Sequence, residues 1–107
     1  MQTITATELA SWLGDPGRTP PLLLDVREAW EFEKCHIQGA QLMAMNTVPA
    51  RYQELEEEAP IVCICHHGAR SMQVASWLER QGFTGVINLT GGVHAWAMQV
   101  DSTMPTY

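Results

Sequence analysis

The sequence predicts an α/β fold in which helices cover both faces of a mostly parallel central sheet. Short apolar segments alternate with helix-like segments along the 107 residues, at spacings typical of β-α-β crossovers. Residues 22–26 are apolar except for one aspartate, as in a strand buried on both faces. A second apolar run, at 61–64, leads through a short glycine-containing loop into a helical periodicity. This length suits one hydrophobic core, so we expect a single domain over residues 1–107.

Composition argues against several classes of partner. The formal net charge is −6 and there are only six Lys and Arg residues, whereas nucleic acids and anionic membranes require a basic face. No apolar run approaches the ~18 residues of a membrane span, and the first residues lack the pattern of a secretory signal. The three cysteines have no framework spacing, which favours reduced thiols and a cytoplasmic protein.

The first elements are marked by turn and capping residues. Residues 5–8 read Thr-Ala-Thr-Glu, a capping box that predicts a helix over 6–13. Ile4 precedes this helix and is expected in a short edge strand. Residues 14–21 are rich in Gly and Pro and predict a loop before the strand at 22–26.

Two charged residues, Asp25 and Arg27, lie at the end of that buried strand. Charges in such a position either border a site or pair with each other. Ligands of parallel sheets bind beyond the carboxyl ends of the strands, so both residues are candidates for a pocket shared with Cys65.

The middle of the chain gives weaker signals. Residues 28–35 are expected to form a short helix with Trp30 facing inward, and 40–44 a strand. A weak apolar stripe predicts a helix over 47–57, and the glutamates within 54–58 indicate a solvated face.

The C-terminal part contains one more strand and one more helix. Residues 86–89 are expected to form the last strand, and two glycines then lead into a helix over 93–100. Residues 101–107 are expected to be a loose tail.

Residues 60–82 form the central unit of strand, tight loop and helix. Cys65 ends the strand, so its sulfur is expected to face the free amides that begin the helix. A helix N-terminus carries roughly half a positive charge and Arg70 adds a full one, which favours a thiolate nucleophile in an anion cradle. The alternative is an inert core cysteine. Two histidines, a glycine, an arginine and a serine within the next six residues favour the reactive interpretation.

Four stretches resemble the single-domain rhodanese (thiosulfate sulfurtransferase) family, in the family's order and spacing: LLLDVREAWEF with HIQGA (22–40), PIVCICHHGARS (60–71), WLERQGF (77–83) and INLTGGVHAW (87–96). The resemblance covers nearly the whole chain. It implies a rhodanese-like three-layer α/β/α fold.

The resemblance also implies roles for individual residues. Cys65 matches the catalytic cysteine that becomes a persulfide. The substrate-binding loop around it would consist of His66, His67, Gly68, Ala69 and Arg70, of which the arginine would hold an anionic donor. Asp25, Arg27 and Ser71 would be supporting residues.

The reaction implied by the resemblance has two steps and requires no metal or other cofactor. The Cys65 thiolate would attack the outer sulfur of thiosulfate and release sulfite. A thiol, cyanide or a protein sulfur acceptor would then remove the sulfur. Backbone amides and Arg70 would stabilise the anions, whereas His66 and His67 are expected to be exposed or to contact the acceptor.

Three other functions remain as alternatives. A phosphatase or arsenate reductase would place five residues between cysteine and arginine, but only four separate Cys65 from Arg70. A metal site of Cys63, Cys65, His66 and His67 would pack four ligands too closely to wrap one tetrahedral ion. A persulfide carrier or interaction module that serves a protein partner stays open.

Cys35 departs from the family pattern, because relatives usually have glycine there. If the turn before His36 keeps a left-handed backbone, a side chain costs about 1–2 kcal/mol and Cys35→Gly should stabilise the fold. The competing interpretation makes Cys35 a resolving thiol for the Cys65 persulfide.

Overall fold

Five short strands form one sheet in which every pairing is parallel. The computed structural model describes residues 1–107, and the strand order is β1-β5-β4-β2-β3. The strands are β1 (Gln2–Ile4), β2 (Leu22–Asp25), β3 (Gln41–Leu42), β4 (Ile61–Ile64) and β5 (Val86–Leu89). Asp25 pairs with Ile64, so β2 and β4 end side by side at the same edge of the sheet.

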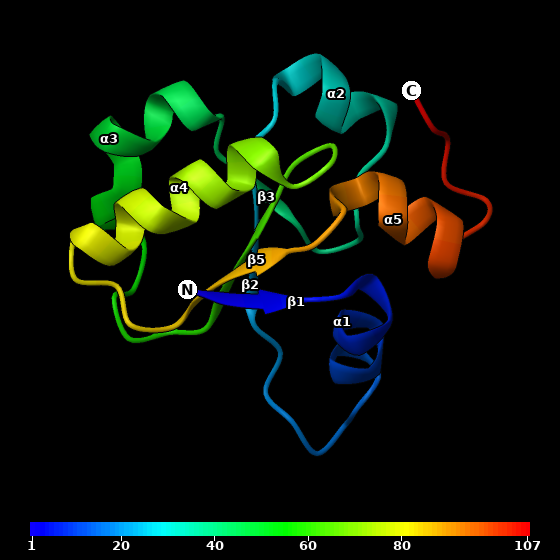
Figure 1. Cartoon of the computed structure of the whole chain (residues 1–107), viewed down its shortest axis with the longest axis horizontal. Helices are drawn as coiled ribbons and strands as arrows, with labels where there is room; N and C mark the ends of the chain where they lie inside the picture. Colours follow the sequence, from blue (N-terminus) through cyan, green and yellow to red (C-terminus); the bar gives the residue numbers. More distant parts are fainter.

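Helices cover both faces of this sheet. Figure 1 shows α1 and α5 on one side, α3 and α4 on the other, and α2 above the carboxyl ends of the strands. The helices are α1 (Ala6–Leu13), α2 (Ala29–Lys34), α3 (Val48–Arg51), α4 (Ala69–Arg80) and α5 (Gly92–Gln99), with 3-10 turns η1 (Met45–Thr47) and η2 (Tyr52–Glu54). The predicted three-layer α/β/α fold is confirmed. None of the helices combines the length and apolarity that crossing a membrane would take.

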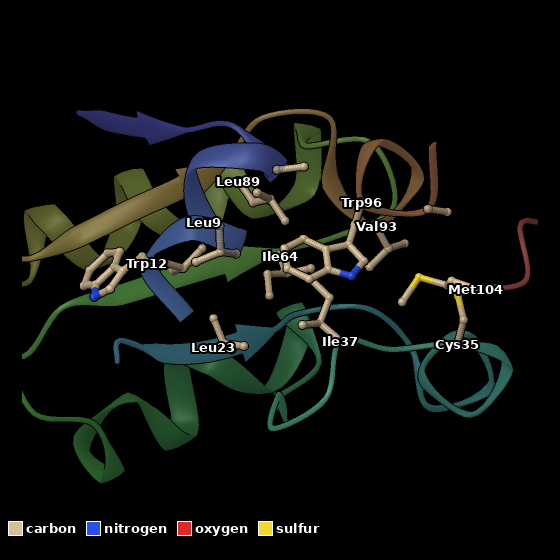
Figure 2. Close-up of a cluster of buried hydrophobic side chains, with 13 residues drawn as sticks. Leu9, Trp12, Leu23, Cys35, Ile37, Ile64, Leu89, Val93, Trp96 and Met104 are labelled. Atoms are coloured by element: carbon tan, nitrogen blue, oxygen red, sulfur yellow. The ribbon is translucent and has the colours of Figure 1, made fainter. Parts of the chain in front are cut away.

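Two apolar clusters fix the central strand β4 from both sides. Successive side chains of a strand point to opposite faces, and Ile64 accordingly packs with α1 and α5, whereas Cys63 packs against α4. Figure 2 shows Ile64 between Leu9 of α1 and Trp96 of α5. All four residues of β4 are buried, so the loop that follows it starts from a rigid position.

The capping box predicted for the first helix is present. The Thr5 hydroxyl accepts a hydrogen bond from the Glu8 amide at 3.1 Å, and the Glu8 carboxylate accepts one from the Thr5 amide at 2.9 Å. Ile4 lies in the edge strand β1, which pairs with β5. The predictions for residues 4–13 are therefore confirmed.

The helix expected at 28–35 forms, but its orientation was predicted wrongly. Trp30 is 60% exposed and its ring meets Tyr107 edge-on at 5.8 Å. The residue that α2 buries is Glu31, which pairs with Arg70 and accepts a hydrogen bond from Tyr107. A prediction from apolarity alone therefore placed the wrong face of α2 toward the interior.

Two other elements in the middle of the chain are shorter than predicted. The strand expected at 40–44 is reduced to β3, and the helix expected at 47–57 is split into α3 with the two 3-10 turns. Only Val48 and Leu55 are buried in this segment. Helices gain most of their stability from packing an apolar face, so two anchors do not support one continuous helix.

The C-terminal helix is confirmed as α5, but the prediction of a loose tail was wrong. Met104 is buried in the cluster against α1 and α5. The Tyr107 hydroxyl accepts a hydrogen bond from Arg27 at 2.9 Å and donates one to Glu31 at 2.7 Å. These contacts fix the end of the chain over α2.

Cys35 does not occupy a left-handed turn. Its backbone is extended, with φ −166° and ψ 148°, so the expected strain is absent and the premise of a stabilising Cys35→Gly change was wrong. Its side chain is buried beside Met104 (Figure 2). Cys65 belongs to the cluster on the opposite face of the sheet, which argues against a resolving role for Cys35.

Candidate functional site

Cys65 lies between the end of β4 and the start of α4, as the sequence predicted. Its Sγ accepts a hydrogen bond from the Gly68 amide at 3.0 Å and another from the Ser71 hydroxyl at 3.3 Å. The residue is 1% exposed. The Gly68 amide and the Ser71 hydroxyl therefore both lie within hydrogen-bonding distance of this sulfur, next to the N-terminus of α4.

Gly68 allows the loop to close on the sulfur. It precedes α4 with φ +110°, a left-handed conformation that residues with a Cβ adopt at a cost. A Cβ there would also lie 3.4 Å from the Gly91 nitrogen and 3.5 Å from the Leu89 oxygen. The glycine thus turns its amide back toward Cys65 in a closely packed position.

Ser71 and Asn88 form a buried polar pair behind the sulfur. The Ser71 hydroxyl lies 2.5 Å from Asn88 Oδ1 and 3.2 Å from the Gly68 oxygen, and its single proton serves one acceptor at a time. The Asn88 amide donates to the same Gly68 oxygen at 3.2 Å. Asn88 was not predicted as a site residue, although a polar residue inside the apolar segment 86–89 was a visible signal.

Arg70 lies on the first turn of α4 and pairs with Glu31 of α2. Nη1 donates to Oε1 at 2.7 Å and Nη2 to Oε2 at 2.8 Å. The hydrogen bonds from Arg70 chiefly hold the pKa of Glu31 at about 2. A donor anion that approaches Arg70 therefore meets a guanidinium that already has a carboxylate partner.

Asp25 and Arg27 form a fully buried ion pair at 2.7 Å, one of the two outcomes predicted. Arg27 also donates to the Cys35 oxygen at 2.7 Å and to Tyr107. Burial tends to lower the pKa of Arg27, but its hydrogen bonds to Asp25 and Tyr107 and the negative charge of Asp25 outweigh burial and raise the pKa. The pair contacts the loop through Tyr107, whose ring stacks on His66 at 3.9 Å.

Three histidines gather beside the loop. The rings of His66 and His67 stack with centroids 3.9 Å apart, and His67 lies 5.1 Å from the ring of His94 on α5. Burial is the main cause that lowers the pKa of His66, and the neighbouring His67 lowers it further. His67 and His94 are exposed, as expected for His67, whereas no role was predicted for His94.

Cys63 is unsuited to the metal site considered from the sequence. Burial raises the pKa of its thiol to about 12, and its side chain packs in the core against α4. The potential ligand atoms that do come together belong to His66, His67 and His94.

The model of the Rhodanese-like domain family matches residues 5–99. The chain is 43% identical over 74 residues to a putative sulfur carrier protein of Bacillus subtilis, covering 69% of this chain and 40% of that protein. It is 38% identical over 76 residues to a sulfurtransferase of Allochromatium vinosum, covering 71% of each. It spans 38% of the length of a chloroplastic rhodanese-like protein of Arabidopsis thaliana and 27% of a probable adenylyltransferase/sulfurtransferase of Mycobacterium tuberculosis.

Solved structures agree with this match. A rhodanese-like domain protein from Staphylococcus aureus superposes with a TM-score of 0.85 at 30% identity, covering 100% of this chain and 99% of that one. Fold, matched length and identity lead to the same result: the chain belongs to the rhodanese-like domain family.

Proposed function

We propose that this protein is a sulfurtransferase that moves a sulfane sulfur from thiosulfate or a similar donor to a thiol or cyanide through a persulfide on Cys65. The observation that carries the proposal is the position of the Cys65 sulfur, which accepts hydrogen bonds from Gly68 and Ser71 at the start of α4. Relatives named as a sulfurtransferase and a putative sulfur carrier support this class of chemistry.

In the first step, the Cys65 thiolate attacks the outer sulfur of thiosulfate. A new S–S bond forms, the S–S bond of thiosulfate breaks, and its electron pair leaves with sulfite. The products are a cysteine persulfide anion and sulfite, so charge balances without an oxidant. Because Cys65 is 1% exposed, the side chains around the loop must shift to admit the donor.

In the second step, cyanide or a thiolate attacks the outer sulfur of the persulfide. The S–S bond breaks toward Cys65, which regains its thiolate, and the acceptor leaves as thiocyanate or as a new persulfide. The first amides of α4, at Ala69 and Arg70, have no intrahelical partner and face the end of the helix where the sulfur lies. They stabilise the anions of both steps.

A persulfide carrier that serves a protein partner is the second candidate. The Arg70–Glu31 pair favours it, since a guanidinium held by two short hydrogen bonds is less available to a small dianion. In this function the sulfur would reach Cys65 from another protein's persulfide, with the same exchange of S–S bonds.

Steady-state transfer of sulfur from thiosulfate to cyanide tests the proposal. We expect turnover in the wild type, none in Cys65→Ser, and retention of most activity in Cys63→Ser and Cys35→Ser. Full activity in Cys65→Ser would contradict the proposal. Turnover with a protein persulfide but not with thiosulfate would favour the carrier.

A further inference from the structure

Three of the four histidines of the chain meet at one point of the surface, beside the Cys65 loop. One ring nitrogen each of His66, His67 and His94 lies within 4.8 Å of the others. We propose that these three residues bind a divalent transition-metal ion, of which Zn²⁺ is the representative case. The proposed sulfur transfer requires no such ion.

The backbone brings the two segments that carry these histidines together. The Val93 amide donates to the Cys65 oxygen at 2.9 Å, and the His94 amide donates to the His66 oxygen at 3.1 Å. Gly92 makes this approach possible, because a Cβ there would overlap the Cys65 and His66 carbonyl oxygens. The first turn of α5 is thus joined to the loop, and the spacing of the histidines is a fixed property of the fold.

The ring nitrogens of the three histidines are free for a ligand. His36, the remaining histidine, is the one whose ring hydrogen-bonds within the chain, to the Phe32 oxygen at 2.8 Å. The ring of His66 is held between those of Tyr107 and His67, with centroids 3.9 Å away on each side. One imidazole is therefore positioned by packing, and two exposed ones lie beside it.

The distances match a site that closes by side-chain rotation. Two nitrogens bound to Zn²⁺ at ~2.0–2.1 Å in a tetrahedral site lie about 3.3 Å apart, and the present limit is 4.8 Å. His67 and His94 are exposed, so rotation to another staggered side-chain conformer closes the difference without moving the backbone.

The donor set defines the class of ion. Imidazole nitrogens suit Zn²⁺, Cu²⁺ and Ni²⁺ rather than Mg²⁺ or Ca²⁺, which prefer oxygen. Three histidines leave a fourth position open to water or a small anion. This set differs from the one considered from the sequence, because it replaces the two cysteines with a histidine from α5.

Calorimetric titration of Zn²⁺ tests the site in the wild type and in a Cys65→Ser background, which removes the thiol as a competing ligand. We expect one ion per chain in both. His94→Ala and His67→Ala should each weaken Zn²⁺ binding about tenfold or more. Removing a residue that only hydrogen-bonds to a metal ligand already lowers metal affinity about 10–100-fold, so losing a ligand should cost at least as much. His36→Ala is the matched control and should bind as its parent does.

Two further measurements separate this site from other causes of weak binding. Co²⁺ bound to the Cys65→Ser protein should show d–d absorption without a sulfur-to-metal charge-transfer band. Saturating Zn²⁺ should raise the Tm of the parent and of His36→Ala by more than it raises the Tm of His94→Ala. Matching melts without metal show that the variants fold. Unchanged affinity in both His94→Ala and His67→Ala, or an equal loss in His36→Ala, overturns the proposal.

Discussion

Asn88 is the residue that holds the hydrogen-bond donors of Cys65 in place. Asn88 lies on β5, and its buried side chain hydrogen-bonds to the Ser71 hydroxyl and to the Gly68 oxygen. Removing it in Asn88→Ala leaves that carbonyl with one partner fewer and the hydroxyl free to reorient. The change therefore removes two buried hydrogen bonds, each worth about 0.5–1.5 kcal/mol.

For Asn88→Ala we expect the rate of persulfide formation to fall about tenfold and the free energy of unfolding to fall by about 1–3 kcal/mol. Single-turnover kinetics with thiosulfate and urea titration measure the two effects. Ser71→Ala should reproduce the loss of rate. If Asn88→Ala lost stability but kept its rate, its role would be packing alone.

Under the proposed function, Glu31 is expected to limit how freely Arg70 meets an anionic donor, because it occupies the Arg70 guanidinium. Glu31→Gln removes the negative charge and weakens the two hydrogen bonds that occupy the guanidinium, so we expect the KM for thiosulfate to fall. Arg70→Ala should raise that KM. Initial rates at varied thiosulfate concentrations measure both changes. A KM that stays the same in both variants would show that this ion pair does not contact the donor.

At the residue scale, the reactive cysteine and its neighbours along the chain could be predicted from the sequence. The residues that contact them from distant parts of the chain could not. Cys65 could be identified because a strand end, a glycine and an arginine follow one another in the chain. Glu31 and Tyr107 are far from Cys65 in sequence, and each looks like an ordinary exposed residue by composition. Their hydrogen bonds depend on how α2 and the chain end fold over the loop.

The turn into α4 depends on the left-handed backbone of Gly68. We expect Gly68→Ala to lower the free energy of unfolding by about 1–2 kcal/mol and to slow sulfur transfer, because its amide donates to Cys65. Gly82→Ala is the matched control, since Gly82 has φ +102° with no atom within 4 Å of an added Cβ.

Urea titrations and cyanide assays of the two alanine variants decide this prediction. Similar losses of stability with a loss of rate in Gly68→Ala alone would support it. Equal rates in the two variants would show that the Gly68 amide has no part in the reaction.

Cys35 caps the end of α2 with an extended backbone and a buried side chain. Cys35→Gly removes apolar contacts beside Met104 and frees the unfolded backbone, so we expect a loss of about 1–2 kcal/mol. Thermal melts should show a lower Tm for Cys35→Gly than for Cys35→Ala, and both below the wild type. A Tm at or above that of the wild type would restore the idea of a strained turn.

At the element scale, strongly patterned segments were predictable. The capping box fixed the start of α1, and the apolar runs of β2 and β4 left no alternative to buried strands. The face that α2 presents was not predictable, because its buried residue is the charged Glu31 rather than Trp30. The prediction for the segment 47–57 was wrong for a related reason. The sequence pattern indicated one helix, whereas the packing supports only short helical turns.

Across the whole molecule, one hydrogen-bonded network joins the segment that follows β2, the helices α2 and α4, and the end of the chain. It runs from Arg27 through Tyr107 and Glu31 to Arg70. Burial, opposed by the bond from Arg27, raises the pKa of Tyr107 to about 12, so this tyrosine stays protonated and can donate to Glu31 at neutral pH. The tail was expected to be loose because its contacts are with elements distant in sequence.

This network makes stability depend on pH in the acid range. The pKa of Glu31 is about 2 in the folded protein, against an ordinary value of 4.5, so the unfolded chain binds the proton more tightly. Its contribution is complete above about pH 4.5 and is lost as the pH falls toward 2.

Urea titrations from pH 6 to pH 3 should therefore show a steeper loss of stability in the wild type than in Glu31→Gln. Glu33→Gln, an exposed position on the same helix, should keep the steep dependence of the wild type. Parallel pH profiles for the wild type and Glu31→Gln would remove Glu31 from the explanation.

The central claim is that Cys65 carries the transferred sulfur, and mass spectrometry after thiosulfate treatment tests it most directly. We predict that the intact protein gains the mass of one sulfur atom, that peptide mapping places it on Cys65, and that cyanide removes it. Cys65→Ser should gain none. A sulfur found on Cys35 or Cys63, or one that persists in Cys65→Ser, would contradict the account.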